Sequence, residues 1–137
     1  MTLTWLLILP AAGALLMLLI PRSWEATIRR TSVGIAVLEF FLSLRLLAAD
    51  YGAPGYRFVE EVPWIESLGI SYRLGIDGLS LWLVLLTTLL TPIALYASWS
   101  SIKTRTKEYA FSFLLLEVGM LGAFFALDVF LFYVFWE

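Results

Sequence analysis

Three glutamates lie inside long apolar stretches of this 137-residue sequence, and their carboxyl groups are the side chains best placed to do chemistry. They are Glu39, Glu117 and Glu137. A charged group at the centre of a membrane helix costs about 2.5–3.5 kcal/mol on insertion scales, so an acid in such a place is a functional candidate. Two coupled carboxyl groups at one depth can relay a proton, because it can reside on either. We therefore interpret all three as candidate proton-translocation residues.

Each of the three acids also has a structural interpretation, and the residues alone leave both interpretations open. Glu39 could be a neutral acid that is hydrogen-bonded to a neighbouring helix. Glu117 could bond helices together beside a stripe of small residues, which marks a helix-packing face. That stripe comprises Gly119, Gly122, Ala123 and Ala126. Glu137 could lie near an aqueous boundary.

The composition indicates a membrane protein and excludes several classes of site. Hydrophobic residues make up 61% of the chain and charged residues 15%, whereas a soluble domain is nearer half and a quarter. The chain contains no cysteine and no histidine, which excludes disulfides, thiolate zinc sites, iron–sulfur ligation and the commonest metal ligand. We therefore predict no metal site and no catalytic redox residue. We also predict no nucleic-acid partner, because no basic patch is present.

The elements that must position the acids are four apolar runs, each sufficient to span the hydrocarbon core of a bilayer. They predict transmembrane helices over residues 3–20, 32–49, 79–98 and 110–127. The first run could instead be a signal peptide, but no positive residue precedes it and Arg22 follows it. The predicted fold class is an all-α polytopic membrane protein, with residues 1–137 forming a single membrane domain.

Residues 50–78 form the one long polar segment, which we predict to be a loop outside the membrane. Apolar residues at positions 70, 72, 74 and 76 alternate with polar or small ones, the period of a half-buried strand. Tyr56-Arg57-Phe58 could be the partner strand, so we expect a small β-hairpin. Asp77 and Gly78 should close the segment as a turn, with Asp77 capping the next helix.

The distribution of basic residues predicts the orientation in the membrane. Connectors 21–31 and 99–109 carry three basic residues each, whereas loop 50–78 carries two beside five acids. Basic residues favour the cytoplasmic side, so both connectors should be cytoplasmic. The amino terminus and loop 50–78 should then lie outside.

Asp128 is a branching point for the end of the chain. A single helix over residues 110–137 would be about 42 Å long, which exceeds a hydrocarbon core of about 30 Å. If the chain instead turns at Asp128, that residue caps a fifth helix over residues 129–137. Glu137 would then lie about 13 Å into the membrane, near its midplane. No Gly or Pro marks a turn, so the residues alone leave both possibilities open.

Several segments of the second half resemble one known family of membrane proteins. They are Val62-Pro63-Trp64-Ile65, residues 69–80, residues 114–120 and residues 127–137. Together they resemble the antiporter-like subunits of the proton-translocating NADH–quinone oxidoreductase (complex I), and among these the subunit M family, whose mitochondrial counterpart is NADH dehydrogenase subunit 4. The specific resemblance runs from about Pro63 to Glu137. Two motifs carry it, the loop segment before the third helix and the segments of the fourth and fifth helices. Either of these motifs alone would also fit related cation/proton antiporter and membrane-bound hydrogenase subunits.

The resemblance implies both a fold and a function. It implies a helix break at Asp128, and a proton-channel role for Glu137 opposite a lysine on a later helix. It implies two inverted repeats with broken helices, so this chain would be the N-terminal fragment of a longer subunit. That subunit would belong to the membrane arm of the complex in the bacterial inner membrane, with the other membrane-arm subunits and the lipid bilayer as partners. NADH, flavin, iron–sulfur clusters and quinone would belong to other subunits.

Two alternatives stand beside this interpretation. The chain could belong to a cation/proton antiporter or membrane-bound hydrogenase of the same superfamily. It could also be a structural membrane module, in which Glu39, Glu117 and Glu137 only bond helices together.

Overall fold

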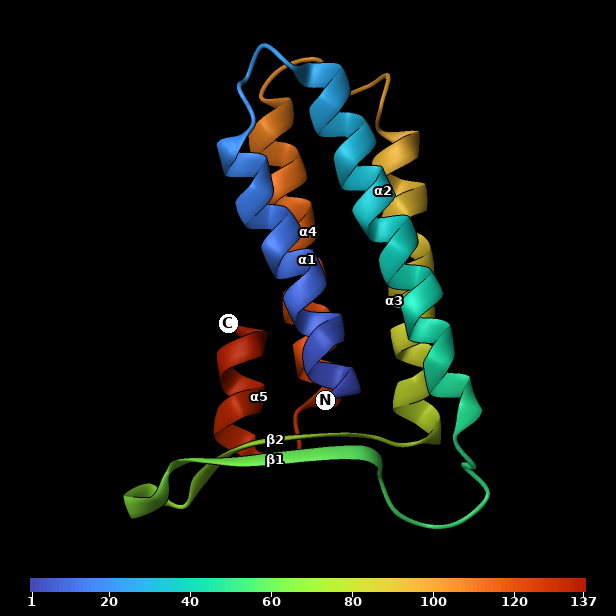
Figure 1. Cartoon of the computed structure of the whole chain (residues 1–137), viewed down its shortest axis with the longest axis vertical. Coiled ribbons are helices and arrows are strands. Elements are labelled where there is room, and N and C mark those ends of the chain that lie inside the picture. Colours follow the sequence, from blue (N-terminus) through green and yellow to red (C-terminus); the bar gives the residue numbers. More distant parts are fainter.

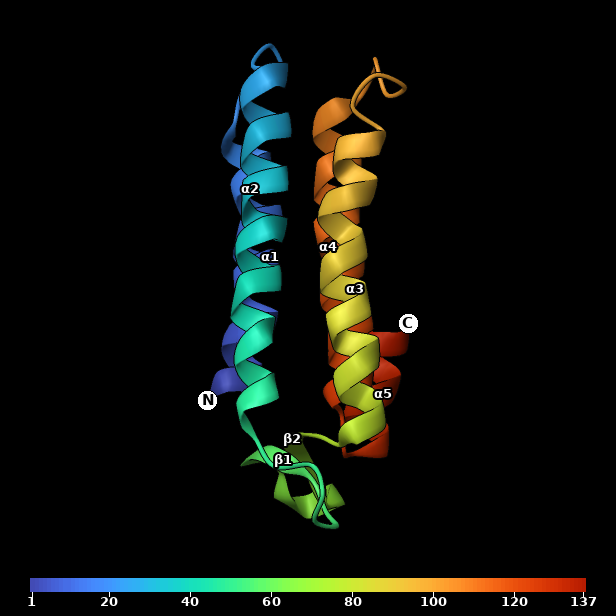
Figure 2. The same ribbon diagram turned by 90° about the vertical axis from the view of Figure 1, so that its right-hand side faces the viewer.

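The computed structural model describes residues 1–137 and is built around four long helices. They are α1 (Thr2–Leu19), α2 (Glu25–Ser43), α3 (Gly78–Ala97) and α4 (Thr106–Phe125). All four are long and apolar enough to cross a membrane, α2 together with the 3₁₀ turn Leu44–Ala48 that extends it. α1 and α2 lie side by side, and α3 and α4 form a second pair against them (Figure 2). The predicted fold class is confirmed.

A two-stranded antiparallel sheet lies across one end of this bundle (Figure 1). Its strands are β1 (Arg57–Ile65) and β2 (Ile70–Ile76). The strand predicted from the alternating residues is confirmed as β2. The partner strand was only partly predicted, because Arg57 pairs with Ile76 but the main pairing runs from Glu60 to Ile65. Pro63 reads as a turn signal in the sequence, yet it is tolerated in a strand with a free edge.

The chain breaks after α4, and α5 (Val129–Trp136) begins at the hairpin end and runs back alongside α4 (Figure 1). The predicted fifth helix is therefore confirmed. The link between the two helices is extended rather than helical. Ala126 bridges to Leu74, and the Leu127 amide donates to the Arg73 carbonyl at 2.9 Å. The link thus attaches to β2, which is why α4 ends at Phe125 rather than continuing to residue 127.

Two predicted helix boundaries were wrong in the same direction. α2 begins at Glu25 rather than at residue 32, and α4 begins at Thr106 rather than at residue 110. Most residues of the added segments, 25–31 and 106–109, are polar, so an apolar run could not reveal them. The helical hydrogen bonds simply continue beyond the apolar segment, where water and neighbouring charged groups can surround polar side chains. The two connectors shrink accordingly to residues 20–24 and 98–105.

Large apolar side chains lie on the outside of the bundle as well as in its interior. Leu19, Phe41, Trp82 and Tyr96 are all more than half exposed on the long helices. The interior holds two clusters, one beneath the hairpin around Leu74 and Phe125 and one near the connectors around Met17, Ile28 and Leu114. An apolar exterior on helices of this length is the surface that lipid would cover.

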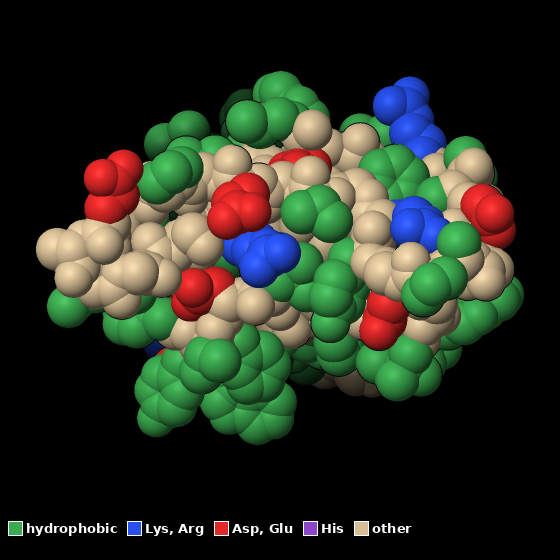
Figure 3. All heavy atoms as spheres, turned by 90° about the horizontal axis from the view of Figure 1, so that it is seen from below, with side chains coloured by type: hydrophobic (Ala, Val, Ile, Leu, Met, Phe, Trp, Pro, Cys, Tyr) green, Lys and Arg blue, Asp and Glu red, His purple; other side chains and the backbone are tan.

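Carboxylates cap three helices at the hairpin end. Glu60 of β1 accepts from the Leu3 amide at 2.8 Å and the Thr4 amide at 3.1 Å, and it pairs with the Met1 ammonium at 3.2 Å. Asp77 accepts from the Ser80 amide at 2.7 Å at the start of α3. Asp128 does the same for α5, accepting from the amides of residues 130 and 131 at 2.9 and 3.2 Å. Figure 3 views the molecule from this end, with acidic and basic side chains scattered among hydrophobic ones.

Cations stabilise the opposite end. The Arg29 guanidinium of α2 donates to the carbonyls of Trp99 and Ile102 in the connector after α3. The Lys107 ammonium donates to the Leu18 carbonyl at 2.6 Å, at the last turn of α1. Positive charge near a helix C-terminus is favourable, because the unpaired carbonyls there carry partial negative charge.

Candidate functional site

Glu39 and Glu117 lie on the buried faces of two neighbouring helices. On α2 the buried positions are 28, 32, 36, 39 and 43, which form one stripe at helical spacing. On α4 the buried positions include 106, 110, 114, 117 and 121, the same pattern. Both glutamates are 0% exposed. The two stripes therefore direct both carboxyl groups into the interior of the bundle.

The two buried acids lie near each other but are otherwise without partners. Glu39 lies close enough to Glu117 for their charges to interact. Thr91 of α3 lies beside Glu117, but its hydroxyl donates to the Thr87 carbonyl at 2.9 Å. All four carboxylate oxygens are buried and lack a hydrogen-bond partner. Such groups are rare in folded proteins, and each one calls for an explanation.

Hydroxyl groups continue the polar interior toward both ends of the bundle. Ser43 and Thr88 share a buried hydrogen bond of 2.8 Å between their hydroxyls, one helical turn from Glu39 toward the hairpin. Toward the connectors, Arg29, Ser32 and Thr106 line a void of about 10 Å³. A void of that size has room for about one water molecule.

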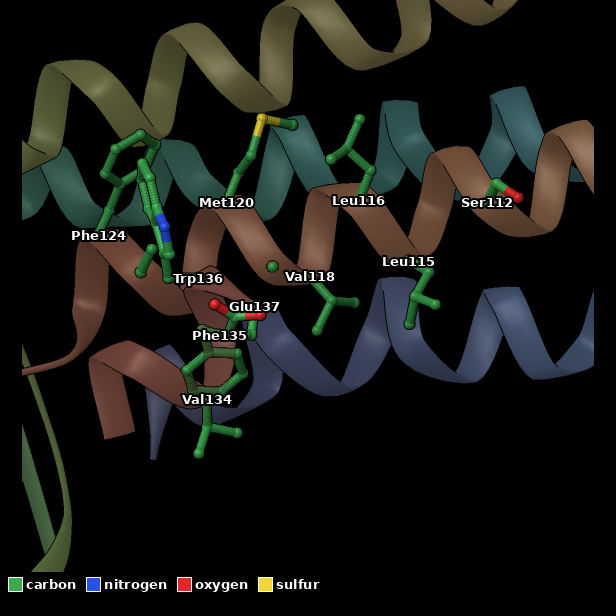
Figure 4. A pocket seen from close by; sticks show the side chains of 12 residues that line it. Ser112, Leu115, Leu116, Val118, Met120, Phe124, Val134, Phe135, Trp136 and Glu137 are labelled. Carbon is green, nitrogen blue, oxygen red and sulfur yellow. The ribbon is translucent and has the colours of Figure 1, made fainter. Parts of the chain in front are cut away.

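Glu137 lies in a different place, on an open groove between α4 and α5. The groove has a volume of about 650 Å³ and a mostly apolar lining, which includes Gly119, Met120 and Trp136 (Figure 4). The Glu137 side chain is exposed. Its neighbours on the groove make it a carboxyl group on an apolar surface, partway along the bundle rather than at its end.

The small-residue stripe of α4 explains how α5 comes so close. A Cβ atom on Gly122 would lie 2.2 Å from the ring of Phe135, which no side chain could accept. A Cβ atom on Gly119 would lie 3.2 Å from the Phe135 carbonyl oxygen. The predicted packing face is therefore confirmed, and α5 is the helix that packs on it.

Glu117 and Glu137 lie at a similar level but on opposite sides of α4. Glu137 lies beside the part of α4 around Gly119, so Glu117 and Glu137 are at a similar level. Yet the groove is lined by Leu116, Gly119 and Met120, whereas Glu117 faces the opposite side of α4. Glu117 therefore approaches Glu39.

Sequence reasoning missed the hydroxyl groups that accompany the two buried acids. Ser43, Thr88 and Thr91 are all buried in the same interface. A signal was present in the spacing, because Ser32, Glu39 and Ser43 fall on one face of α2. The aspartates predicted as caps, Asp77 and Asp128, occupy the N-cap positions of α3 and α5.

Comparisons with known proteins point to one family. The family model described as "NADH-ubiquinone oxidoreductase chain 4, amino terminus" matches residues 56–127. NADH-quinone oxidoreductase subunit M of Rhodobacter capsulatus is 42% identical over 134 residues, which cover 94% of this chain and 26% of the relative. NADH-ubiquinone oxidoreductase chain 4 of Arabidopsis thaliana is 38% identical, over 98% of this chain and 28% of the relative.

A cyanobacterial protein matches to a similar extent. NAD(P)H-quinone oxidoreductase chain 4 2 of Thermosynechococcus vestitus is 36% identical over 137 residues, covering 98% of this chain and 26% of the relative. The chain thus spans about a quarter of the length of the curated relatives that it matches.

Proposed function

Because this chain belongs to the family of NADH–quinone oxidoreductase subunit M and chain 4, we propose that it forms part of a proton-translocating membrane subunit of that complex. Electron transfer would take place in other subunits, which would hold the NADH, flavin, iron–sulfur and quinone sites. The other membrane-arm subunits of the complex and the lipid bilayer would be its partners. Redox energy released elsewhere would drive proton movement through carboxyl groups of this chain.

The observation that carries the proposal is the position of Glu137. The chain breaks at Asp128, and α5 then runs back along α4 from the hairpin end. This brings a carboxyl group to the level of Gly119, partway along the bundle, on an open groove with an apolar lining. It is the one carboxyl group that α5 presents there, because the other side chains of α5 are apolar except for the Tyr133 hydroxyl and the Trp136 indole.

The test is Glu137→Gln in the native complex. We expect NADH-driven proton pumping into inverted membrane vesicles to fall at least tenfold, while the complex still assembles. The matched control is Glu66→Gln, an exposed acid in the hairpin. Pumping at the parental level in an assembled Glu137→Gln complex would show the proposal to be wrong. A variant that fails to assemble is replaced by Glu137→Asp, which keeps the acid and should retain partial pumping.

We further propose a sidedness, with the amino terminus and loop 50–78 outside and the two connectors in the cytoplasm of a bacterial cell. The basic residues of the connectors support it. The chain has no cysteine, so a single introduced one can be labelled cleanly. In whole cells, an impermeant thiol reagent should label Ala53→Cys and leave Ser101→Cys unlabelled. The reverse pattern would overturn this orientation.

A further inference from the structure

Glu39 and Glu117 form a buried site that the role of Glu137 does not explain. We propose that this pair holds at least one proton at neutral pH and acts as a proton-holding site inside the bundle. The inference deepens the proposed function and rests on it only for the later use of that proton. The presence of the proton follows from the surroundings of the two carboxyl groups.

The first argument is the absence of any compensating positive charge. α1 and α3 carry no charged side chain. In the middle of α2 and α4, Glu39 and Glu117 are the only charged residues. Arg29 lies ten residues from Glu39, about 15 Å along α2, and its guanidinium is bound to carbonyls of a connector. Arg45 is exposed at the other end of α2. Lys107 is ten residues from Glu117 and donates to Leu18.

The second argument is the cost of leaving both acids ionised. Each would be a buried anion with no hydrogen-bond donor, and the two would also repel each other. Removing one charge by binding a proton relieves both effects. It also supplies a donor, since a protonated carboxyl group carries one O–H. A proton is therefore the simplest ligand that makes the pair compatible with its surroundings.

The third argument distinguishes a proton from a metal cation. A hard cation needs six or more oxygen ligands. The two carboxyl groups supply four oxygens, and the Thr91 hydroxyl beside Glu117 supplies a fifth. This set of oxygens suits a proton better than a metal cation.

The hydroxyl pair of Ser43 and Thr88 gives the proton a route from the hairpin end. Ser43 lies one turn from Glu39 on the same buried face of α2, and it bonds to Thr88 at 2.8 Å. Either hydroxyl can be the donor once it turns from the carbonyl that it also contacts, which is that of Phe40 for Ser43 and that of Val84 for Thr88. Such a reversible pair can pass a proton toward Glu39 from a water at the hairpin end.

The main test is infrared spectroscopy of the purified native complex at neutral pH. The parental complex should show the carbonyl stretch of protonated carboxylic acids, and the double variant Glu39→Gln/Glu117→Gln should lose part of that band. The control double variant, Glu25→Gln/Glu66→Gln, changes two exposed acids and should leave the band unchanged. Glutamine has the shape of protonated glutamate, so the variant should assemble. If it does not, Glu117→Asp serves instead, because it should shift the band in frequency.

Two results would overturn the proposal. One is a carboxylic acid band of equal area in the parent and in the double Gln variant. The other is a band that is absent at physiological sodium concentration and appears only when sodium is removed, which would indicate a cation site. Neither result depends on pumping. Conversely, normal pumping by Glu137→Gln would refute the proposed function and leave the band where it is.

A second measurement tests the route. In heavy water the band should shift as its proton exchanges, and Thr88→Val should slow that exchange at least tenfold. Thr87→Val is the matched control, because Thr87 lies on the same helix outside the buried interface and also bonds to a carbonyl four residues earlier, at 2.8 Å. Equal exchange rates in the two variants would show that the proton does not pass through Thr88.

Discussion

The two ends of the bundle stabilise their helix termini with opposite charges. At the hairpin end, the carboxylates Glu60, Asp77 and Asp128 accept hydrogen bonds from the first amides of α1, α3 and α5. At the connector end, Arg29 and Lys107 donate to carbonyls at or just beyond the last turns of α3 and α1. The odd-numbered helices all start at the hairpin, so their first amides lie at that end and their last carbonyls lie at the connector end (Figure 1).

This difference connects two properties that are usually considered separately. Basic connectors are taken as a sign of orientation in the membrane. Here the same cations also bond to the carbonyls that the helices expose at that end. Glu25 and Glu108 lie in the first turns of α2 and α4 at the connector end, yet neither makes a capping hydrogen bond. The acids at the hairpin end therefore cap helices, whereas Glu108 at the connector end pairs with Arg22 at 2.7 Å.

Low pH should have the largest effect on the stability of the helix termini, because it protonates all three capping carboxylates together. Burial alone would raise the pKa of Glu60, but its hydrogen bonds to Thr4 and Leu3 and to the amino terminus hold that pKa below its ordinary 4.5. Hydrogen bonds from Ser80 and Leu131 likewise lower the pKa of Asp77 and of Asp128 below 3.8.

A lowered pKa in the folded state contributes stability that is complete above the ordinary pKa and is lost as pH falls through the lowered one. Below about pH 4, amide hydrogen exchange should therefore speed up in the first turns of α1, α3 and α5, after correction for the intrinsic rate. Residues 98–105 should keep their protection, because the side chain that binds their carbonyls is the Arg29 guanidinium and not a carboxylate. Simultaneous loss of protection at both ends of the bundle would contradict the difference between the two ends.

Glu60→Ala should have the largest effect of any single substitution. It leaves the amides of Leu3 and Thr4 without an acceptor in a site where Glu60 is only 9% exposed. We expect a loss of about 3 kcal/mol in the free energy of unfolding, from lost hydrogen bonds and desolvated donors. Circular dichroism of the subunit in detergent measures it as a lower unfolding temperature. Glu61→Ala is the control, since Glu61 makes only a half-exposed ion pair with Arg73.

Arg29→Met should have an intermediate effect at the opposite end. The substitution keeps an unbranched side chain but removes the donors to Trp99 and Ile102. Charged hydrogen bonds of this kind contribute about 2 kcal/mol. The expected readout is a lower unfolding temperature together with faster hydrogen exchange in residues 98–105. Arg30→Met, one position along and exposed, should change neither quantity.

Lys107→Met should have the smallest effect. Its hydrogen bond to the Leu18 carbonyl is exposed, so solvent competes with it. We expect a loss of about 0.5 kcal/mol or less, decreasing further at high salt. Lys103→Met is the matched control in the neighbouring connector. A loss comparable with that of Glu60→Ala would show that the connector end depends on its caps as strongly as the hairpin end does.

The sequence was sufficient to predict the elements that depend on local pattern. Four long apolar runs, the alternation in β2 and the small-residue face of α4 all correspond to features of the structure. The break at Asp128 was harder, because no Gly or Pro marks it. What produces the break is the attachment of residues 126 and 127 to β2, a contact with residues about fifty positions earlier.

Features that depend on contacts distant in sequence, or on the direction in which a helix faces, could not be predicted. The cap of α1 comes from Glu60, 56 and 57 residues away from the amides that it binds. The pairing of Glu117 with Glu39 rather than with Glu137 depends on the rotation of α4 about its own axis. Depth along the membrane can be counted from residue numbers, but that rotation is set by how α1, α2, α3 and α5 pack against α4.

The position of Glu60 also sets an order of events during synthesis. The first turn of α1 leaves the ribosome long before the carboxylate that caps it, so that turn stays without its acceptor until β1 has been made. α5 has the opposite history. When its first residues emerge, Arg73 is already present to receive the Leu127 amide, as is Ser71 to bond to Asp128 at 3.4 Å. The hairpin is thus made after the helix that it caps, α1, and before the helix whose start it positions, α5.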